Sequence, residues 1–350
     1  MTDRINRPSG DGDEKQGDII MLDVGSGGKK TASFIAERIL PLFDNEALSV
    51  LGDGAVLSGS ERLVFSTDSF VVSPAFFPGG NIGKLAVCGT VNDVCMAGGD
   101  PKYLSLSLII EEGFPLSRLD EILATIHLEA EAAGVQVVTG DTKVVERGAC
   151  DGIFINTAGI GFLKHASLSA DRIREGDGVI VSGTVGEHGA TVMLARNEGL
   201  VDGADIRSDC ASLKDAALAL MEGLGEDLRC MRDPTRGGIA TTLNEWTEGK
   251  KTGIILKEKS VPVSPPVDLI CEMLGLDPYY MACEGRLLAV VAREQTEKAL
   301  DILRSFPYAK DAALIGTVSD ARAGKVVART PYGTDRILTK LAGEQLPRIC

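Results

Sequence analysis

Residues 63–96, LVFSTDSFVVSPAFFPGGNIGKLAVCGTVNDVCM, join a strand pattern to a helix pattern and decide how the first half of the chain is interpreted. Leu63–Phe70 has the β-branched and aromatic content of a strand, and Asn81–Met96 has the apolar pattern of a helix. Asp68 stands in the strand and Asp93 near the end of the helix, each among apolar residues. Because an unpaired carboxylate in apolar surroundings is costly, these acids point to a functional site.

The segments that follow complete a first domain of mixed α and β structure. A polar lead-in over residues 1–20 is expected to be disordered. Beyond the opening stretch, the patterns predict two helices and three strands, at Thr31–Leu40, Leu116–Ala133, Leu104–Ile110, Val135–Val145 and Ile153–Leu163. This order of elements indicates an α+β domain over residues 21–163.

The second half has its own set of elements, so the chain divides in two. Residues 164–177 are polar, lack a sustained apolar period and are expected to link the domains. Residues 178–328 follow as a second domain, with helices expected at Glu187–Asn197, Ala211–Gly223, Arg236–Glu248, Val263–Gly275 and Glu294–Ser305 and strands at Gly178–Ser182, Leu287–Ala292 and Ala313–Val318. The apolar pattern then becomes sparse, which predicts a mobile tail over residues 329–350.

Composition excludes several classes of protein. A length of 350 residues exceeds the size at which one core usually stops growing, which agrees with two domains. The formal charge of −14 repels nucleic acid and anionic membranes, and no apolar run is long enough to span a bilayer. The eight cysteines include no CxxC pair, and the polar N-terminus has no signal-peptide segment, so reduced thiols in the cytoplasm are expected.

Aspartates recur in the first half beside glycine or at a strand end, as Asp53, Asp68, Asp93 and Asp141. A single one is more often part of a turn than of a site. Several acids in apolar segments, however, suit a hard cation such as Mg²⁺, with glycines that let phosphate oxygens approach the backbone. Lys143 follows Asp141 on the same strand face, where it would help to neutralise a polyphosphate; a surface lysine is the alternative.

The glycine-rich segment GSGGKKT at residues 25–31 invites comparison with a phosphate-binding P-loop, and the comparison fails. A P-loop has Ser or Thr directly after its Gly-Lys pair, and Lys30 occupies that position here. Gly27 and Gly28 remain candidates for a flap whose backbone N–H groups approach phosphate. A linker without a function would have the same composition.

Two charged motifs stand out in the second half. DPTRGG at residues 233–238 precedes a predicted helix, where Arg236 would pair with phosphate or carboxylate, or where the motif simply caps the helix. Glu284 lies shortly before an apolar strand and is a candidate general base, with a surface ion pair as the alternative. The three histidines have no metal-ligand spacing.

The chain ends in a cysteine, Cys350, within the terminal sequence LPRIC. A terminal thiol is exposed, and Arg348 nearby favours its thiolate, which is a good nucleophile. An extended tail of this length reaches on the order of 60 Å, enough to visit a remote site or another protein. An exposed thiol without a role is a liability, so its position predicts a function for Cys350.

Together these segments resemble the HypE family of hydrogenase maturation proteins, carbamoyl dehydratases of the PurM-like (AIR synthetase-related) superfamily. The resemblance covers nearly the whole chain from about Gly25 and rests on TDSFVVSPAFFPGGNIGKLAVCGTVNDV, LSLIIEEGF, TGDTKVVERG, FINTAGIG, DPTRGG, EGRLLAVV and the terminal LPRIC. The chain differs in having GDGA at residues 52–55, where the superfamily has GDDA. It also has DVGSGGK at residues 23–29, where the family more often has His-Gly and then Arg.

The resemblance implies an α+β, PurM-like two-domain architecture: an N-terminal α+β domain with a dimer-forming sheet, a C-terminal α/β domain and a flexible C-terminal tail. It implies ATP and Mg²⁺ as cofactors. The implied partners are a second copy of the chain, a HypF-type carbamoyltransferase and a HypC–HypD iron scaffold. The carbamoyltransferase would place a carbamoyl group on Cys350. ATP-dependent dehydration would then convert this S-carboxamide to a thiocyanate, whose cyanide goes to the iron of NiFe-hydrogenase.

The resemblance also implies roles for individual residues. Cys350, Glu284 and Lys143 would be catalytic, with Glu284 beside the tail thiol. The implied metal ligands are the carboxylates of Asp53, Asp68, Asp93, Asp141 and Asp233. The implied nucleotide contacts are Gly27, Gly28, Asp68, Asn92, Asp93, Asp141 and Lys143.

Two other functions remain open on the sequence. A selenophosphate synthetase or an amidine-forming ligase of the same superfamily would keep the aspartates and make Cys350 dispensable. The first of these would need a reactive Cys near the N-terminus, and the first cysteine here is Cys88. A non-catalytic scaffold would bind other maturation proteins through its tail without turning over ATP, although unused buried acids would only lower its stability.

Overall fold

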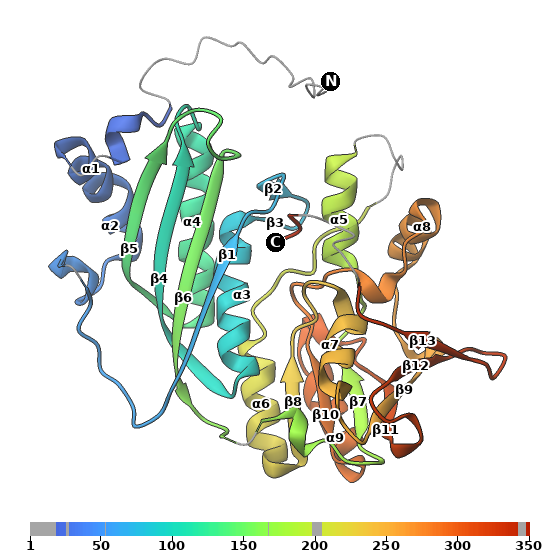
Figure 1. Cartoon of the computed structure of the whole chain (residues 1–350). Helices are drawn as coiled ribbons and strands as arrows, with labels where there is room; N and C mark the ends of the chain where they lie inside the picture. Colours follow the sequence, from blue (N-terminus) through green and yellow to red (C-terminus); the bar gives the residue numbers. More distant parts are fainter. Residues whose placement is uncertain (1–18, 26–27, 53, 167, 198–204, 342–347) are drawn as a thin grey trace.

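The computed structural model of the chain describes residues 19–25, 28–52, 54–166, 168–197, 205–341 and 348–350. Two sheets lie side by side, and helices α3 (Ile82–Met96) and α6 (Lys214–Leu224) contact each other between them (Figure 1). Within the described residues, no helix is both long and apolar enough to cross a membrane.

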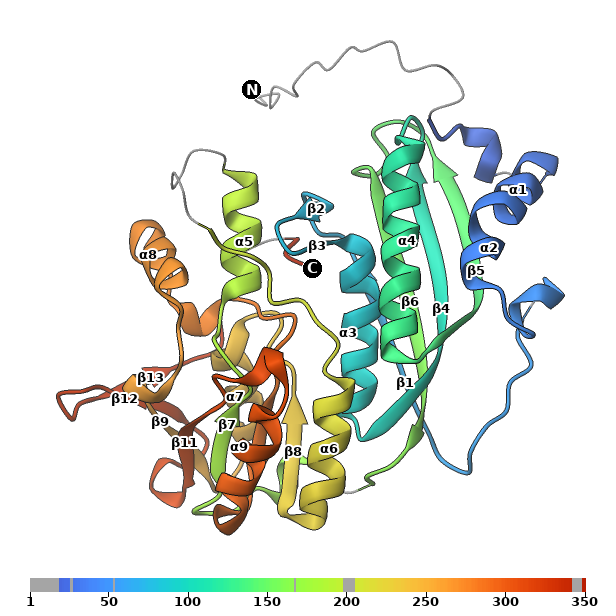
Figure 2. The same cartoon turned by 180° about the vertical axis from the view of Figure 1, so that it is seen from behind.

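The N-terminal domain is built on a four-stranded sheet in the order β1-β6-β4-β5. Its strands are Leu63–Phe70 (β1), Gly99–Glu111 (β4), Gln136–Val145 (β5) and Ile153–Leu163 (β6), and only β4 and β5 among these neighbours run parallel. Helices α3 and α4 (Leu116–Ala133) cover one face of the sheet (Figures 1 and 2). The opposite face carries Leu63, Phe65 and Ile109, whose side chains are 53%, 68% and 42% exposed.

Helix α3 carries Asp93, and its close approach to the sheet depends on small residues. The short strands β2 (Phe76–Phe77) and β3 (Gly80–Asn81) lead into it, and the side chain of Asn81 caps its first turn. Along β6, a methyl group at Gly161 would lie 2.4 Å from Cγ1 of Val94, a helix residue. Gly161, and Gly159 on the same face of β6, therefore allow the helix to lie directly on the strand.

An N-terminal arm lies along the β5 edge of this sheet. The sequence predicted one helix over Thr31–Leu40; the arm instead contains α1 (Lys29–Phe34) and α2 (Leu40–Phe43), joined by a π-helical turn. The side chain of Asn45 donates a hydrogen bond to the carbonyl of Val137, at 2.8 Å, and so ties the arm to β5.

The C-terminal domain holds a seven-stranded sheet in the order β13-β12-β9-β11-β7-β10-β8. Its strands are Gly178–Val181 (β7), Leu228–Arg232 (β8), Gly253–Lys257 (β9), Leu288–Val291 (β10), Ala313–Ser319 (β11), Val326–Arg329 (β12) and Asp335–Leu338 (β13). The helices are Glu187–Arg196 (α5), α6, Gly238–Thr247 (α7), Pro265–Leu274 (α8) and Thr296–Arg304 (α9). Residues of α6 and α9 pack on one face of the sheet and residues of α7 on the other.

Two segments that were expected to lack structure are partly ordered. Ile20, in the expected lead-in, is buried, and its backbone pairs with that of Gly113 and Phe114. In the expected tail, Asp335–Leu338 forms β13 against β12, and residues 348–350 lie against the N-terminal domain. Strands β8, β9 and β12 were not predicted, although none of them is shorter than β7 or β10, which were.

Adding one methyl group at Gly161 tests the contact between α3 and β6. We expect Gly161→Ala to lower the free energy of unfolding by about 1–3 kcal/mol, because the methyl group cannot be accommodated beside Val94. Gly59→Ala is the matched control, since nothing lies within 4 Å of a methyl group there. Urea denaturation of the three proteins measures the difference, and equal stability of both variants would contradict the packing described here.

Candidate active site

Four acidic side chains lie close enough to shift one another's pKa values where the two domains meet. Asp68 comes from β1, Asp93 from α3, Asp233 from the end of β8 and Glu284 from the loop before β10. Burial raises the pKa of Asp68 and that of Asp93. Burial also raises the pKa of Asp233 to about 7, and the neighbouring Asp93 adds to this shift. Such a cluster of repelling, poorly hydrated acids favours the binding of a cation.

Glu284 is 2% exposed, and its Oε1 has no hydrogen-bond partner among the described residues. This burial raises the pKa of Glu284 well above its usual range, and the carboxylates of Asp233 and Asp209 raise it further. Asp209 also holds the backbone, because its carboxylate accepts hydrogen bonds from the N–H groups of Glu284 and Gly285, at 3.2 and 3.3 Å. The surface ion pair considered for Glu284 is therefore excluded, and a buried acid suited to proton transfer remains.

Arg236 offsets part of this negative charge. It lies near enough to Asp68 and Asp93 to oppose the increase in their pKa values. Helix α7 begins after Gly237 without a side-chain cap, so the DPTRGG motif is not a conventional helix cap. Gly238 is required for close packing, because a methyl group there would lie 2.5 Å from the carbonyl oxygen of Tyr279.

The end of the chain lies against the loop that follows β1. The N–H group of Val71 donates to the carbonyl of Cys350 at 3.0 Å, and that of Ser73 donates to the carbonyl of Arg348 at 3.3 Å. The guanidinium of Arg348 donates in turn to the carbonyl of Val71, at 3.0 Å. Cys350, whose thiol is not in a disulfide, is half-buried beside the segment that continues from Asp68.

Two residues of α5, which the sequence analysis did not select, hold this terminal segment from the C-terminal domain. Nε2 of His188 lies 2.7 Å from the carbonyl oxygen of Ile349, and Arg196 donates hydrogen bonds to the carbonyls of Ser73 and Arg348. Burial lowers the pKa of His188 to about 4, so the imidazole is neutral near pH 7. The available signal was a His-Gly pair at a helix start, and nothing local shows that this helix meets the chain terminus.

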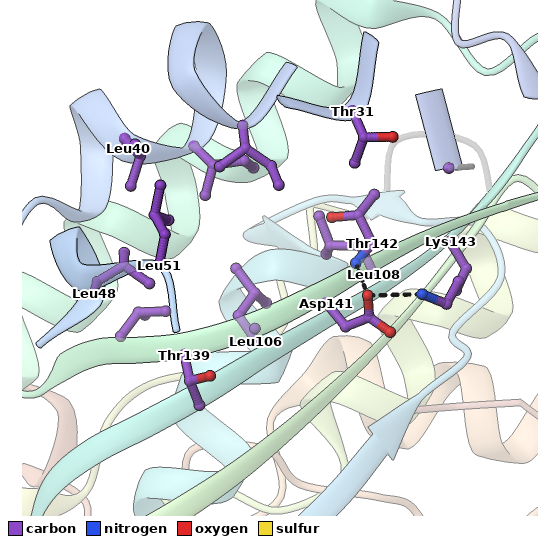
Figure 3. Close-up of a pocket in the computed structure, with 15 residues that line it drawn as sticks. Thr31, Leu40, Leu48, Leu51, Leu106, Leu108, Thr139, Asp141, Thr142 and Lys143 are labelled. Atoms are coloured by element: carbon purple, nitrogen blue, oxygen red, sulfur yellow. Dashed lines mark hydrogen bonds and ion pairs between the residues drawn. The ribbon is translucent and has the colours of Figure 1, made fainter. Parts of the chain in front are cut away.

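Asp141 and Lys143 lie in a different place, at the polar end of a pocket between the arm and β5 (Figure 3). The pocket has a volume of about 760 Å³, counting its open mouth. Its apolar wall contains Ile35, Ile39, Leu40, Leu48 and Leu51. Nζ of Lys143 lies 2.9 Å from Oδ1 of Asp141, which confirms that the two side chains share a strand face.

The sheet separates this pair from the buried acids. Ser69 pairs with Asn156, Asn156 with Ser107 and Ser107 with Asp141, so these side chains lie on one face of the sheet. Asp68 precedes Ser69 and therefore points to the other face. Asp68 and Asp141 therefore do not lie in the one metal cluster expected from the aspartates, and no group of three His, Cys, Asp or Glu side chains among the described residues can hold a metal ion.

The remaining predicted contacts divide into two groups. Gly27 and Asp53 lie outside the described residues, while Gly28 is exposed at the start of α1. Asn92 was expected to contact the nucleotide. Its side chain instead donates to the carbonyl of Ala211 at 3.1 Å and accepts from the N–H group of Leu213 at 2.7 Å. In this structure Asn92 thus joins α3 to the segment that leads into α6.

Comparisons with known proteins agree with this architecture. Residues 51–163 match the N-terminal domain of AIR synthase related proteins, and residues 174–329 match their C-terminal domain. Carbamoyl dehydratase HypE of Azotobacter vinelandii is 46% identical over 340 residues, which are 97% of this chain and 99% of the relative. Carbamoyl dehydratase HypE of Escherichia coli K12 is 43% identical over 338 residues, or 95% and 99% of the two chains.

Solved structures give the same result. The crystal structure of hydrogenase maturation protein HypE in complex with ATP has a TM-score of 0.90 at 47% identity and covers 94% of this chain and 99% of that one. The HypE–HypF complex has a TM-score of 0.77 at 46% identity, with coverage of 88% and 100%. Thiamine monophosphate kinase of Aquifex aeolicus, at 20% identity and a TM-score of 0.58, shares the fold alone.

The two domain matches define the chain as an AIR synthase related protein. Within that class it belongs to the HypE family of carbamoyl dehydratases, the enzymes of hydrogenase maturation that its relatives represent. The alternatives of a selenophosphate synthetase and an amidine-forming ligase therefore have no support.

The buried histidine predicts an acid-dependent loss of stability. His188 has a pKa of about 4 in the folded chain, below the 6.5 of an exposed histidine, so the unfolded chain takes up its proton first. Its contribution to the free energy of unfolding is fully present above pH 6.5 and is lost as the pH falls toward 4, a change on the order of 3 kcal/mol. We expect the difference in stability between the wild type and His188→Gln to shrink over this range.

Urea denaturation of both proteins at about pH 7.5, 6.5, 5.5 and 5.0 would measure that difference. These values extend from above the pKa of an exposed histidine, about 6.5, to well below it. His127 and His165 are present in both proteins, so subtraction removes their contribution. A difference that is constant with pH would show that His188 is protonated equally in the two states.

Proposed function

We propose that this chain catalyses the ATP-dependent dehydration of an S-carboxamide carried on its own Cys350, which yields a protein thiocyanate that supplies cyanide to the iron of NiFe-hydrogenase. The supporting observation is the docking of Arg348–Cys350 on residues 71–73, directly after the strand that bears Asp68. The backbone of the terminal residue is thereby held beside the strand that bears Asp68.

The reaction replaces a poor leaving group by a good one. The amide oxygen of the S-carboxamide takes the γ-phosphoryl group of ATP, and the amide nitrogen loses one proton. Phosphate then leaves with the C–O electron pair as the second N–H proton is removed, and the carbon–nitrogen triple bond forms. The chain therefore has to position a phosphoryl donor, stabilise negative charge and accept protons.

Glu284 is suited to accept these protons. Its burial raises its pKa, which makes its carboxylate a stronger base than an exposed one, and its Oε1 is free of hydrogen bonds to the described residues. Lys143 carries the positive charge on the polar side of the pocket and is our candidate for the phosphate-binding cation.

The pocket between the arm and β5 fits a nucleotide. Its apolar wall suits a base, and its polar end holds Thr31, Asp141 and Lys143. A relative has been solved in complex with ATP. Asp68 and Asp93 fit Mg²⁺, which commonly takes one or two carboxylates and completes its shell with water and phosphate oxygens. When bound, the ion would stabilise charge on the transferred phosphoryl group.

The partners follow from the same chemistry. A HypE–HypF complex has been solved for a relative, and a HypF-type carbamoyltransferase would load Cys350 in this chain. A HypC–HypD iron scaffold would then receive the cyanide. Each of these exchanges requires residues 348–350 to leave the site in which they are docked.

Mass spectrometry of the C-terminal peptide tests the proposed reaction. After incubation with carbamoyl phosphate, a HypF-type carbamoyltransferase and Mg–ATP, we expect Cys350 to carry a carbamoyl group that becomes lighter by one water. Glu284→Gln should be carbamoylated normally and dehydrated at least about 100-fold more slowly, because the proton acceptor is removed. Glu272→Gln, on the exposed side of α8, should behave as the wild type.

Cys350→Ala serves as the blank, because it has no terminal thiol to modify. A wild-type chain that is carbamoylated but never loses water would be a carrier, and the proposal would fail. Turnover of ATP with an unmodified Cys350 would remove the role of the terminal thiol.

We further propose that the site is completed between two copies of the chain. Lys143 lies on the open face of the N-terminal sheet, and Glu284 lies with Asp68 beyond the other face, so the two residues cannot meet within one chain. The open face exposes Phe65 and neighbouring apolar residues, which suits an interface with a second copy. A homodimer through this face would bring the phosphate-binding cation of one copy to the terminal thiol of the other.

Complementation between two inactive variants tests this arrangement. Lys143→Ala and Glu284→Gln should each be inactive alone. After mixing and exchange of subunits, we expect about one quarter of wild-type activity, because half of the dimers are mixed and each holds one intact site. The rate of water loss from Cys350 is the readout.

A mixture as inactive as its components would mean that both residues act within one copy. Phe65→Asp supplies the control for the interface, since it places a charge on the open face. This substitution should give a monomer in sedimentation and should abolish complementation when it is added to both variants.

A further inference from the structure

His188 is one of two residues of α5, with Arg196, that hydrogen-bond to the backbone of the terminal segment. It lies in the first turn of α5 and is completely buried. Its Nε2 is 2.7 Å from the carbonyl oxygen of Ile349, and its Nδ1 is 2.8 Å from Oγ of Ser208. A carbonyl only accepts, so Nε2 carries the proton and Nδ1 accepts from the hydroxyl of Ser208. The ring of Phe77 packs edge-on against the imidazole, at 5.3 Å and 84°, and fixes its plane.

Ser208 begins a segment that also holds the proposed proton acceptor. Asp209 accepts hydrogen bonds from the N–H groups of Glu284 and Gly285, and the N–H group of Ala211 donates to the carbonyl of Glu284 at 3.4 Å. Residues 208–211 therefore connect the histidine that bonds to the terminal segment with the backbone that carries Glu284.

Direct backbone contacts keep this segment in place on both sides. A methyl group at Gly285 would lie 1.8 Å from the carbonyl oxygen of Asp209, so the two backbones touch. On the other side, the N–H group of Ser208 donates to the carbonyl of Pro78 at 2.9 Å, and a methyl group at Gly79 would lie 2.9 Å from the carbonyl oxygen of Ser208. The segment thus transmits position, because neighbouring backbone holds its own backbone directly on both sides.

We infer that His188 is a positioning residue for the proposed reaction: through Ser208 and Asp209 it sets the carbonyl of Ile349, and so the thiol of Cys350, at a fixed place relative to Glu284. This inference rests on the proposed function. It requires no contact of the imidazole with nucleotide or with the reacting atoms. Its effect is geometric, since a displacement of about 1 Å can lower a rate 100-fold.

The test compares His188→Leu, which removes the hydrogen bond, with His188→Gln, whose amide N–H can replace that of Nε2. His127→Leu, on α4, is the control for loss of a histidine. For each protein we would measure the rate of water loss from carbamoylated Cys350 in a single turnover and the KM for ATP. The melting temperature and the rate at which iodoacetamide alkylates Cys350, followed on the C-terminal peptide, complete the set.

For His188→Leu we expect water loss to be slowed about 10- to 100-fold with an unchanged KM for ATP, because the nucleotide pocket is untouched. Alkylation of Cys350 should become faster by about tenfold, since one hydrogen bond fewer holds the terminal segment. His188→Gln should recover most of both effects, and His127→Leu should show neither.

The outcomes separate the inference from the proposed function. If the wild type loses no water, the proposed function fails, whatever the variants do. If the wild type reacts and His188→Leu matches it in rate and in alkylation, the inference is overturned and the proposed function stands. If His188→Leu does not fold, Ser208→Ala decides: it keeps the imidazole and removes the group that sets its tautomer. Wild-type values for that variant would overturn the inference.

Discussion

The contact between α3 and β6 is the constraint on which the candidate site depends. Because glycine at positions 159 and 161 lets the helix lie directly on the strand, Asp93 on the helix lies near Asp68 on the neighbouring strand. On the same helix, Asn92 bonds to residues 211 and 213 and so fixes the segment that leads into α6. The packing of α3 on β6, which involves only uncharged residues, thus holds the sheet, the helix and the segment before α6 in one arrangement.

That arrangement lowers the stability of the folded chain where acids are buried and raises it where apolar residues pack together. Burial of Asp233 and Glu284 beside other acids raises their pKa values, which is unfavourable unless protons or cations are bound. A continuous cluster of buried apolar residues runs from the N-terminal sheet through α3 and α6 to one face of the second sheet and includes Ile349. The terminal segment is therefore part of the core when it is docked, because Ile349 is buried in this cluster and Cys350 packs against it.

The N-terminal sheet divides the chemistry between its two faces. Its covered face supports Asp68 and Asp93, and its open face carries Asp141 and Lys143 next to the arm pocket. Strand alternation makes this separation unavoidable within one chain. The exposed apolar residues of the open face are thus linked to the proposed reaction, since a second copy is the simplest way to bring the two groups together.

The sequence by itself determined what depends on neighbouring residues. Strand β6 and helix α4 were predicted with the bounds that the structure has, because their hydrophobic periods are long. Asp68 and Asp93 were selected as acids among apolar residues, and Glu284 as a candidate general base before an apolar strand. Only the tertiary structure decided that Asp141 and Asp68 lie on opposite faces, because the register of strands far apart in sequence sets the face. It also decided that His188 meets Ile349 across 161 positions. A hydrogen bond between such distant residues leaves no periodic pattern in the sequence, since it exists only after both domains have packed.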